Sequence, residues 1–156
     1  MHSQSHNKLL ILASTSRYRK SLLERLGLPF QTWSPDVDET ALEKEPASDL
    51  VKRLARLKAA SAQDRFPEAV VIGSDQVAEC EGEIVGKPGT ADRAQAQLAS
   101  FSGRTVRFLT AVHVRCGASA IEHDAVVETA AVFRKLSGEE IERYIEQDQP
   151  CLLYTS

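Results

Sequence analysis

The first folded segment joins a buried-strand pattern directly to a helix pattern, and this order restricts the fold more than any other feature. The apolar run Lys8–Ala13 predicts a strand, and Arg17–Leu26 predicts a helix that stops at Gly27. Pro29 then turns the chain into a second strand near Phe30–Trp33. A β-α-β start of this kind predicts an α/β protein.

The remaining elements are predicted to alternate in a similar way. In chain order they are a helix over Ala47–Arg65, a strand over Ala69–Gly73, a hairpin turning at Glu81–Glu83, a helix from Thr90 to Ser100, strands over Val106–Val114 and Ala125–Phe133, and a helix opening with a Ser137–Glu140 capping box. With 156 residues, 42% hydrophobic content and no internal repeat, the chain is predicted to form a single domain or two small lobes that share a sheet.

Composition excludes several classes of function. A net charge of −3 argues against a broad basic surface for nucleic acid. No stretch is long and apolar enough to span a bilayer, and the N-terminus lacks the apolar core of a secretory signal, so we expect a cytoplasmic protein without a membrane partner. The three cysteines show no metal-type spacing, so neither zinc nor disulfides are expected.

The hydroxyl loop Ser14–Ser16 leads into a helix with three basic residues in its first turn, Arg17, Arg19 and Lys20. Helix N-termini attract anions because their first N–H groups are unpaired and the helix dipole is positive there. Cations at this end oppose the dipole, so a bound phosphate would explain them. The alternative is that Ser16 is only an N-cap and the bases form a solvated face.

Two acidic positions are candidates for catalysis and metal binding. Asp75 follows the predicted strand Ala69–Gly73 at its carboxyl end, where α/β sheets usually bind ligands and where an acid can orient water or hold a cation. Glu39 lies in the acidic loop Asp36–Glu39 and would complete an oxygen site for Mg²⁺ or Mn²⁺ if it converged with Asp75. The alternatives are a turn aspartate and a solvated loop.

Two lysines complement these acids. Lys58 lies on the apolar side of its predicted helix, one turn after Leu54, so its ammonium either reaches water or meets an anion near the sheet. Lys87 is held between Gly86 and Pro88 in a rigid turn that suits phosphate, although a plain surface turn would have the same sequence.

Taken together, these segments resemble the Maf-like nucleotide pyrophosphatases. The resemblance covers about residues 8–150 and rests on Ser14-x-Ser16-x-x-Arg19, Val37-Asp38-Glu39, Arg53-Leu54-Ala55-x-x-Lys58-Ala59, Gly73-Ser74-Asp75-Gln76 and Gly86-Lys87-Pro88. It implies an elongated, ITPase-like α/β fold with a mixed sheet flanked by helices and two lobes around a cleft. Ser74-Asp75-Gln76 is similar to the branch that acts on 7-methylguanosine triphosphate.

The resemblance also implies roles for single residues. Asp75 would be the general base and would hold a divalent metal, Mg²⁺ or Mn²⁺, together with Glu39. The triphosphate would be bound by Ser14, Ser16, Arg19, Lys58 and Lys87. Tyr18 and Gln76 would set the base preference, since a cationic methylated guanine is attracted to an aromatic face, although Tyr18 could instead pack its helix.

The implied reaction is hydrolysis of 7-methyl-GTP to 7-methyl-GMP and pyrophosphate, which removes a modified nucleotide. The alternatives are a pyrophosphatase acting on dTTP, UTP or another noncanonical nucleotide, and a nucleotide-binding regulator of cell division without catalysis. A homodimer is compatible with the resemblance.

The chain departs from the resemblance at two points. Arg17 stands where the family usually has proline. The tail Cys151–Ser156 replaces a motif that the family usually continues, so we expect a C-terminal part that is truncated relative to the family.

Overall fold

The structure is a computed structural model that describes residues 8–148 of the 156-residue chain. The elements are β1 (Leu10–Ala13), α1 (Arg17–Glu24), β2 (Gln31–Trp33), α2 (Ala47–Arg65), β3 (Val70–Cys80), β4 (Glu83–Val85), α3 (Ala91–Phe101), β5 (Thr105–Cys116), a short 3₁₀ turn over Gly117–Ser119, β6 (Ile121–Val132) and α4 (Gly138–Asp148). Within these residues no helix is both long and apolar enough to cross a membrane. The atypical tail lies outside them.

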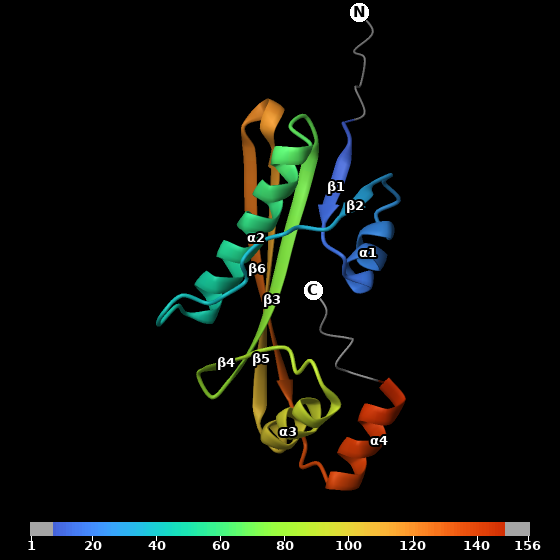
Figure 1. Cartoon of the computed structure of the whole chain (residues 1–156), viewed down its shortest axis with the longest axis vertical. Coiled ribbons are helices and arrows are strands. Elements are labelled where there is room, and N and C mark those ends of the chain that lie inside the picture. The colour runs from blue at the N-terminus through green and yellow to red at the C-terminus, as the bar shows by residue number, and fades with distance from the viewer. Residues whose placement is uncertain (1–7, 149–156) are drawn as a thin grey trace, which may run out of the picture.

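The strands form one mixed sheet in the order β2-β1-β3-β5-β6, with β4 also paired to β3. The short strands β1 and β2 run parallel to each other, and β1 runs parallel to β3, whereas β3, β5 and β6 are antiparallel neighbours. The three long strands follow the long axis of the molecule (Figure 1). One lobe holds β1, β2, α1 and α2, and the other holds β4, α3 and α4, so the predicted elongated fold with two lobes is confirmed.

One edge of β3 is left open where the two lobes meet. β5 pairs with β3 along its whole length, from Val70 to Cys80. The other edge is taken by β1 at Val70–Gly73 and by β4 at Ala78–Cys80. Among the described strands none pairs with residues 74–77 on that edge, and this segment carries Asp75.

The helices begin where the sequence predicts them. Ser16 caps α1 by accepting from the Arg19 amide, and Thr90 caps α3 in the same way through Arg93. The capping box of α4 is present, with the Glu140 carboxylate accepting from the Ser137 amide at 2.9 Å. Local side-chain bonds of this kind depend only on neighbours in the chain, which is why the sequence identifies them.

The predicted strands are too short in three places. The strand expected to end at Gly73 continues to Cys80, so Asp75 lies inside β3 and the prediction that it follows the strand end is wrong. The strands expected over Val106–Val114 and Ala125–Phe133 span Thr105–Cys116 and Ile121–Val132. The polar residues in these segments do not end them, because continuous pairing among β3, β5 and β6 satisfies their backbone groups.

Helix α2 packs unusually close to β3 at Gly73. A Cβ at this position would lie 2.1 Å from the carbonyl oxygen of Ala55 and 2.9 Å from the Cβ of Ala59. Small residues on both elements therefore permit the close approach. This contact brings Lys58, which lies between Ala55 and Ala59 on α2, against Asp75 of β3.

Replacing Gly73 with alanine is expected to lower the free energy of unfolding by about 3 kcal/mol or more, because backbone atoms of α2 would have to move. Urea unfolding followed by circular dichroism measures this effect. Gly86→Ala is the matched control, since nothing lies within 4 Å of a Cβ there, and it should change stability by less than about 0.5 kcal/mol. Equal stability of the two variants would contradict the packing.

Candidate active site

A buried lysine joins the two predicted acids. Lys58 of α2 is 2% exposed, and its Nζ lies 2.8 Å from Oδ1 of Asp75 and 3.0 Å from Oε1 of Glu39. The alternative that its ammonium reaches water is therefore wrong. The acids that the sequence places in separate segments converge on one cation.

Asp75 lies in a low-dielectric environment that changes its acidity. Burial raises the pKa of the Asp75 carboxyl above its ordinary value, although the charges of Lys58 and Arg19 act in the opposite direction. A carboxylate with a raised pKa accepts a proton more readily than an ordinary aspartate, which suits a general base.

The hydroxyl loop Ser14–Ser16 directs one of the three basic side chains, Arg19, toward the site. The Ser14 hydroxyl accepts from the Ser16 amide at 3.1 Å and from Nη1 of Arg19 at 3.4 Å. Burial lowers the pKa of Arg19, whereas the charges of Asp75 and Glu39 raise it. Lys20 instead forms an exposed ion pair on its own helix at 3.9 Å.

The loop that carries Glu39 is fastened to α2 by an arginine. Arg53 donates to both carboxylate oxygens of Glu45, at 2.7 and 2.8 Å, and to the carbonyl oxygen of Thr40 at 2.9 Å. The bonds from Arg53 and from the Leu42 amide lower the pKa of the Glu45 carboxyl to about 2. Because Thr40 follows Glu39 directly, Arg53 positions this carboxylate for Lys58.

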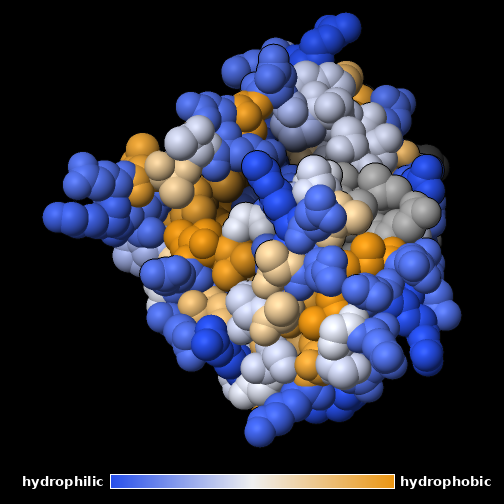
Figure 2. Space-filling view, turned by 60° about the horizontal axis from the view of Figure 1, so that its bottom comes forward, coloured by the Kyte–Doolittle hydropathy of each residue, from blue (hydrophilic) through white to orange (hydrophobic). Residues whose placement is uncertain are grey.

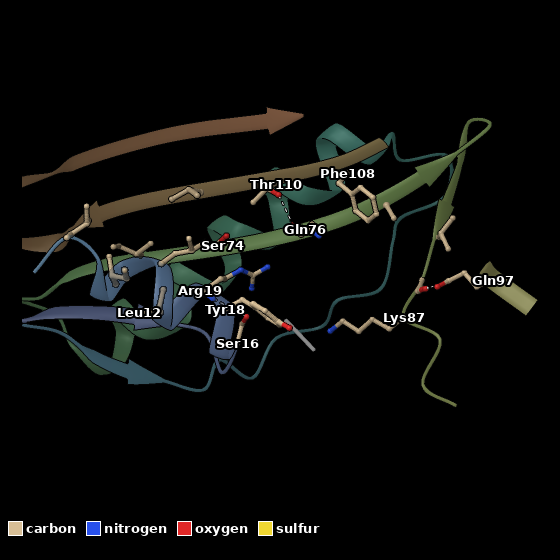
Figure 3. A pocket seen from close by; sticks show the side chains of 18 of the residues that line it. Leu12, Ser16, Tyr18, Arg19, Ser74, Gln76, Lys87, Gln97, Phe108 and Thr110 are labelled. Carbon is tan, nitrogen blue, oxygen red and sulfur yellow. Dashed lines mark hydrogen bonds between the residues drawn. The ribbon is translucent and has the colours of Figure 1, made fainter. Parts of the chain in front are cut away.

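A cavity of about 610 Å³ lies on the face of β3 that points away from α2 (Figure 3). Its polar lining comes from Ser16, Tyr18, Arg19, Ser74, Gln76, Lys87, Gln97 and Thr110. Leucines of α1 and residues of the long strands supply a larger apolar part. The space-filling view shows apolar patches on the inner part of a face, with hydrophilic atoms between them and around the rim (Figure 2).

The alternation of β3 separates the two halves of the site. Ser74 and Gln76 face the cavity, whereas Asp75 contacts Lys58 of α2 on the other face. Arg19 and Lys87 link the halves: both line the cavity, Arg19 is influenced by the charge of Asp75, and Nζ of Lys87 lies 3.8 Å from Oε2 of Glu39. The open edge of β3, at residues 74–77, lies between the two halves of the site.

The cavity also holds residues that the sequence analysis missed. Phe108 and Thr110 of β5 line it beside Gln76, and Gln97 of α3 donates to the carbonyl oxygen of Gly86 at 2.8 Å (Figure 3). Tyr18 lines the same cavity and is 59% exposed, so it is not buried by helix packing. The i, i+2 spacing of Phe108 and Thr110 would have placed them on one face, had the pairing of β5 with β3 been known.

Comparison with known families decides the lineage. The family described as Maf-like protein matches residues 9–152, which is most of the chain. The chain belongs to the Maf-like family. The prediction from the five sequence segments is therefore confirmed.

This Maf-like chain has relatives named 7-methyl-GTP pyrophosphatase. It is 50% identical over 141 residues to one from Polaromonas sp., 51% over 144 residues to one from Aromatoleum aromaticum, and 47% over 141 residues to one from Pseudomonas aeruginosa. Each match covers 90% of this chain, and the chain covers 64%, 73% and 73% of those relatives respectively.

A solved structure agrees with the fold of this Maf-like chain. The crystal structure of protein VC0702 from Vibrio cholerae matches with a TM-score of 0.50 and 10% sequence identity, over 93% of this chain and 81% of that one. At this identity the likeness concerns the fold alone.

The two acids of the Maf-like site are oxygen ligands of the type that divalent metals take. The described residues contain no group of three or more histidine, cysteine or acidic side chains that could hold an ion. Asp75 and Glu39 nevertheless already share one cation, the Lys58 ammonium, and each carboxylate has a second oxygen. Mg²⁺ commonly uses one or two protein carboxylates together with substrate phosphates, and Asp75 and Glu39 are carboxylates of this kind.

Proposed function

We propose that this chain carries the nucleotide-binding and catalytic residues of a 7-methyl-GTP pyrophosphatase, which hydrolyses 7-methyl-GTP to 7-methyl-GMP and pyrophosphate and so removes a modified nucleotide. The single observation that carries the proposal is the buried Lys58–Asp75–Glu39 cluster beside a nucleotide-sized cavity. The relatives that bear this name support the choice of substrate.

Asp75 is the general base of the proposed reaction. Its carboxylate takes a proton from water as the water oxygen attacks the α-phosphorus, and the bond to the bridging oxygen of the β-phosphate breaks. The bridging electron pair leaves with pyrophosphate. The raised pKa of Asp75 supports this role, because it makes the carboxylate a stronger proton acceptor.

The triphosphate is bound by the cations and hydroxyls that surround the open edge of β3. Arg19 and Lys87 contact it from the cavity, and Lys58 contacts it from the α2 side, where they stabilise the charge that develops on the leaving pyrophosphate. Ser14 and Ser16 line the phosphate pocket, since their hydroxyls already lie beside Arg19.

Glu39 and Asp75 would hold a divalent cation, Mg²⁺ or Mn²⁺. When bound, such a cation supplies positive charge that neutralises the phosphate oxygens. The base lies in the cavity, where Tyr18 and Phe108 offer aromatic faces to the cationic ring of 7-methylguanine and Gln76 offers a hydrogen bond to its edge. A cation–π contact of this kind is worth about 0.5–2 kcal/mol.

Pyrophosphate release from a nucleotide panel tests the proposal. The 156-residue chain is incubated with Mg²⁺ and 7-methyl-GTP, GTP, dTTP, UTP or CTP, with EDTA as the metal-free control. We expect release mainly from 7-methyl-GTP and its loss in EDTA. Preference for dTTP or UTP would favour the other pyrophosphatase branch, and binding of 7-methyl-GTP without release would favour a non-catalytic nucleotide-binding protein.

A further inference from the structure

The amide of Gln76 is held by a residue on the neighbouring strand. Gln76 of β3 and Thr110 of β5 are direct register partners, and both line the cavity. The Thr110 hydroxyl donates to Oε1 of Gln76 at 3.0 Å, as the dashed line in Figure 3 shows. Because an amide oxygen and its NH₂ group lie on opposite branches, this bond turns Nε2 of Gln76 away from Thr110.

Thr110 is suited to hold this orientation. Its side chain is β-branched and has few accessible rotamers, so the position of its Oγ1 is restricted on a paired strand. Gln76 is exposed and has no other hydrogen bond among those found for the described side chains. In the observed bond Oε1 of Gln76 is the acceptor, so Nε2 is the amide atom left for a ligand, and without the threonine hydroxyl the amide would lose this partner.

The chemistry of the base makes this orientation matter. Methylation at N7 of guanine removes the ring acceptor beside O6, so O6 is the one acceptor left on that edge of the ring. An NH₂ donor facing the cavity can form a hydrogen bond to O6 of guanine. It cannot form one to the exocyclic amino group of adenine, because that group is also a donor. A site whose polar group is fixed in this way rejects the mismatched base more strongly than a site that can rotate.

We propose that Thr110 is a positioning residue that fixes the amide of Gln76 with its NH₂ group toward the base, so that the site selects a 6-oxopurine over a 6-aminopurine. The inference deepens the proposed function and rests on it. It assigns Thr110 no contact with the reacting phosphates, so the change expected on its substitution is in base selection rather than in turnover.

The test compares Thr110→Val, which keeps the shape and removes the hydroxyl, with Thr110→Ser, which keeps the hydroxyl. Thr129→Val is the matched control, because Thr129 is an exposed strand threonine of β6 outside the cavity lining. Dissociation constants for 7-methyl-GTP and ATP are measured by calorimetry without metal, and kcat/KM for both is measured with Mg²⁺.

We expect Thr110→Val to lower the preference for 7-methyl-GTP over ATP by about tenfold, in both the ratio of dissociation constants and that of kcat/KM. Thr110→Ser should restore the preference, and Thr129→Val should leave it unchanged. An unaltered preference in Thr110→Val, or an equal loss on both nucleotides, would overturn the role of Thr110.

The two readouts separate this inference from the proposed function. Selective binding by the wild-type chain without release of pyrophosphate would overturn the proposed hydrolysis, while the dissociation constants would still decide the role of Thr110. Binding of neither nucleotide by the wild-type chain would overturn both.

Discussion

The Asp75→Asn variant is expected to hydrolyse 7-methyl-GTP with a kcat about 10³-fold lower than that of the wild-type chain, because an amide cannot accept the proton of the attacking water. The fold should persist. An asparagine oxygen can still accept the hydrogen bond that Nζ of Lys58 donates to Asp75 at 2.8 Å. Initial rates of pyrophosphate release give kcat, and thermal unfolding followed by circular dichroism checks the fold.

Asp36→Asn is the matched control for this variant. Asp36 is an exposed acid of the loop that also contains Glu39, and it is not part of the Lys58 cluster. We expect it to retain kcat within about twofold, as a substitution of an exposed residue outside the cluster does. A kcat for Asp75→Asn within tenfold of the wild-type value would contradict the assignment of Asp75 as the base.

The Lys58→Met variant is expected to lose about 3 kcal/mol of unfolding free energy at neutral pH, because it leaves the buried carboxylate of Asp75 without its cation. Turnover should be lost as well, since Lys58 joins Asp75 to Glu39. Urea unfolding measures the stability. Lys52→Met, six positions earlier in α2, is the control for removing a lysine charge from this helix.

The loss of stability in Lys58→Met should depend on pH in a defined direction. Burial already raises the pKa of Asp75, and removal of the Lys58 charge raises it further. The unfolded chain ionises this carboxyl near the ordinary value of about 3.9, whereas the folded variant resists ionisation. The penalty is therefore absent below that pH and grows as the pH rises toward the folded pKa.

Unfolding free energies of Lys58→Met at pH 5 and pH 8, without metal, check this dependence. We expect a larger deficit at pH 8, and most of it should be recovered by adding Asp75→Asn, which removes the unpaired charge. A deficit that is independent of pH, or one that the second substitution fails to reduce, would show that the Lys58–Asp75 pair is not the cause.

The sequence predicted the features that depend on neighbouring residues. The capping bonds of Ser16 and Thr90 and the Ser137–Glu140 box are local, and the bounds of α2 follow from its own periodic pattern. Family resemblance then identified the lineage, which the family match confirms. The sequence suggested a convergence of Glu39 and Asp75, and in the structure both carboxylates contact Nζ of Lys58.

The extent of the long strands could not be predicted in the same way. β3 continues through Ser74, Asp75 and Gln76 because β5 pairs with each of them, and that pairing joins segments more than thirty residues apart. The strand assignment in turn decides which side chains share a face. Once β3 is known to continue, its alternation places Asp75 toward α2 and Gln76 toward the cavity, beside Phe108 and Thr110.

The central claim is that water attacks the α-phosphorus of 7-methyl-GTP, and hydrolysis in water enriched with oxygen-18 tests it most directly. Mass spectrometry of the products locates the label. The account predicts one labelled oxygen in 7-methyl-GMP and unlabelled pyrophosphate. Label in the pyrophosphate, or release of 7-methyl-GDP and inorganic phosphate, would contradict it.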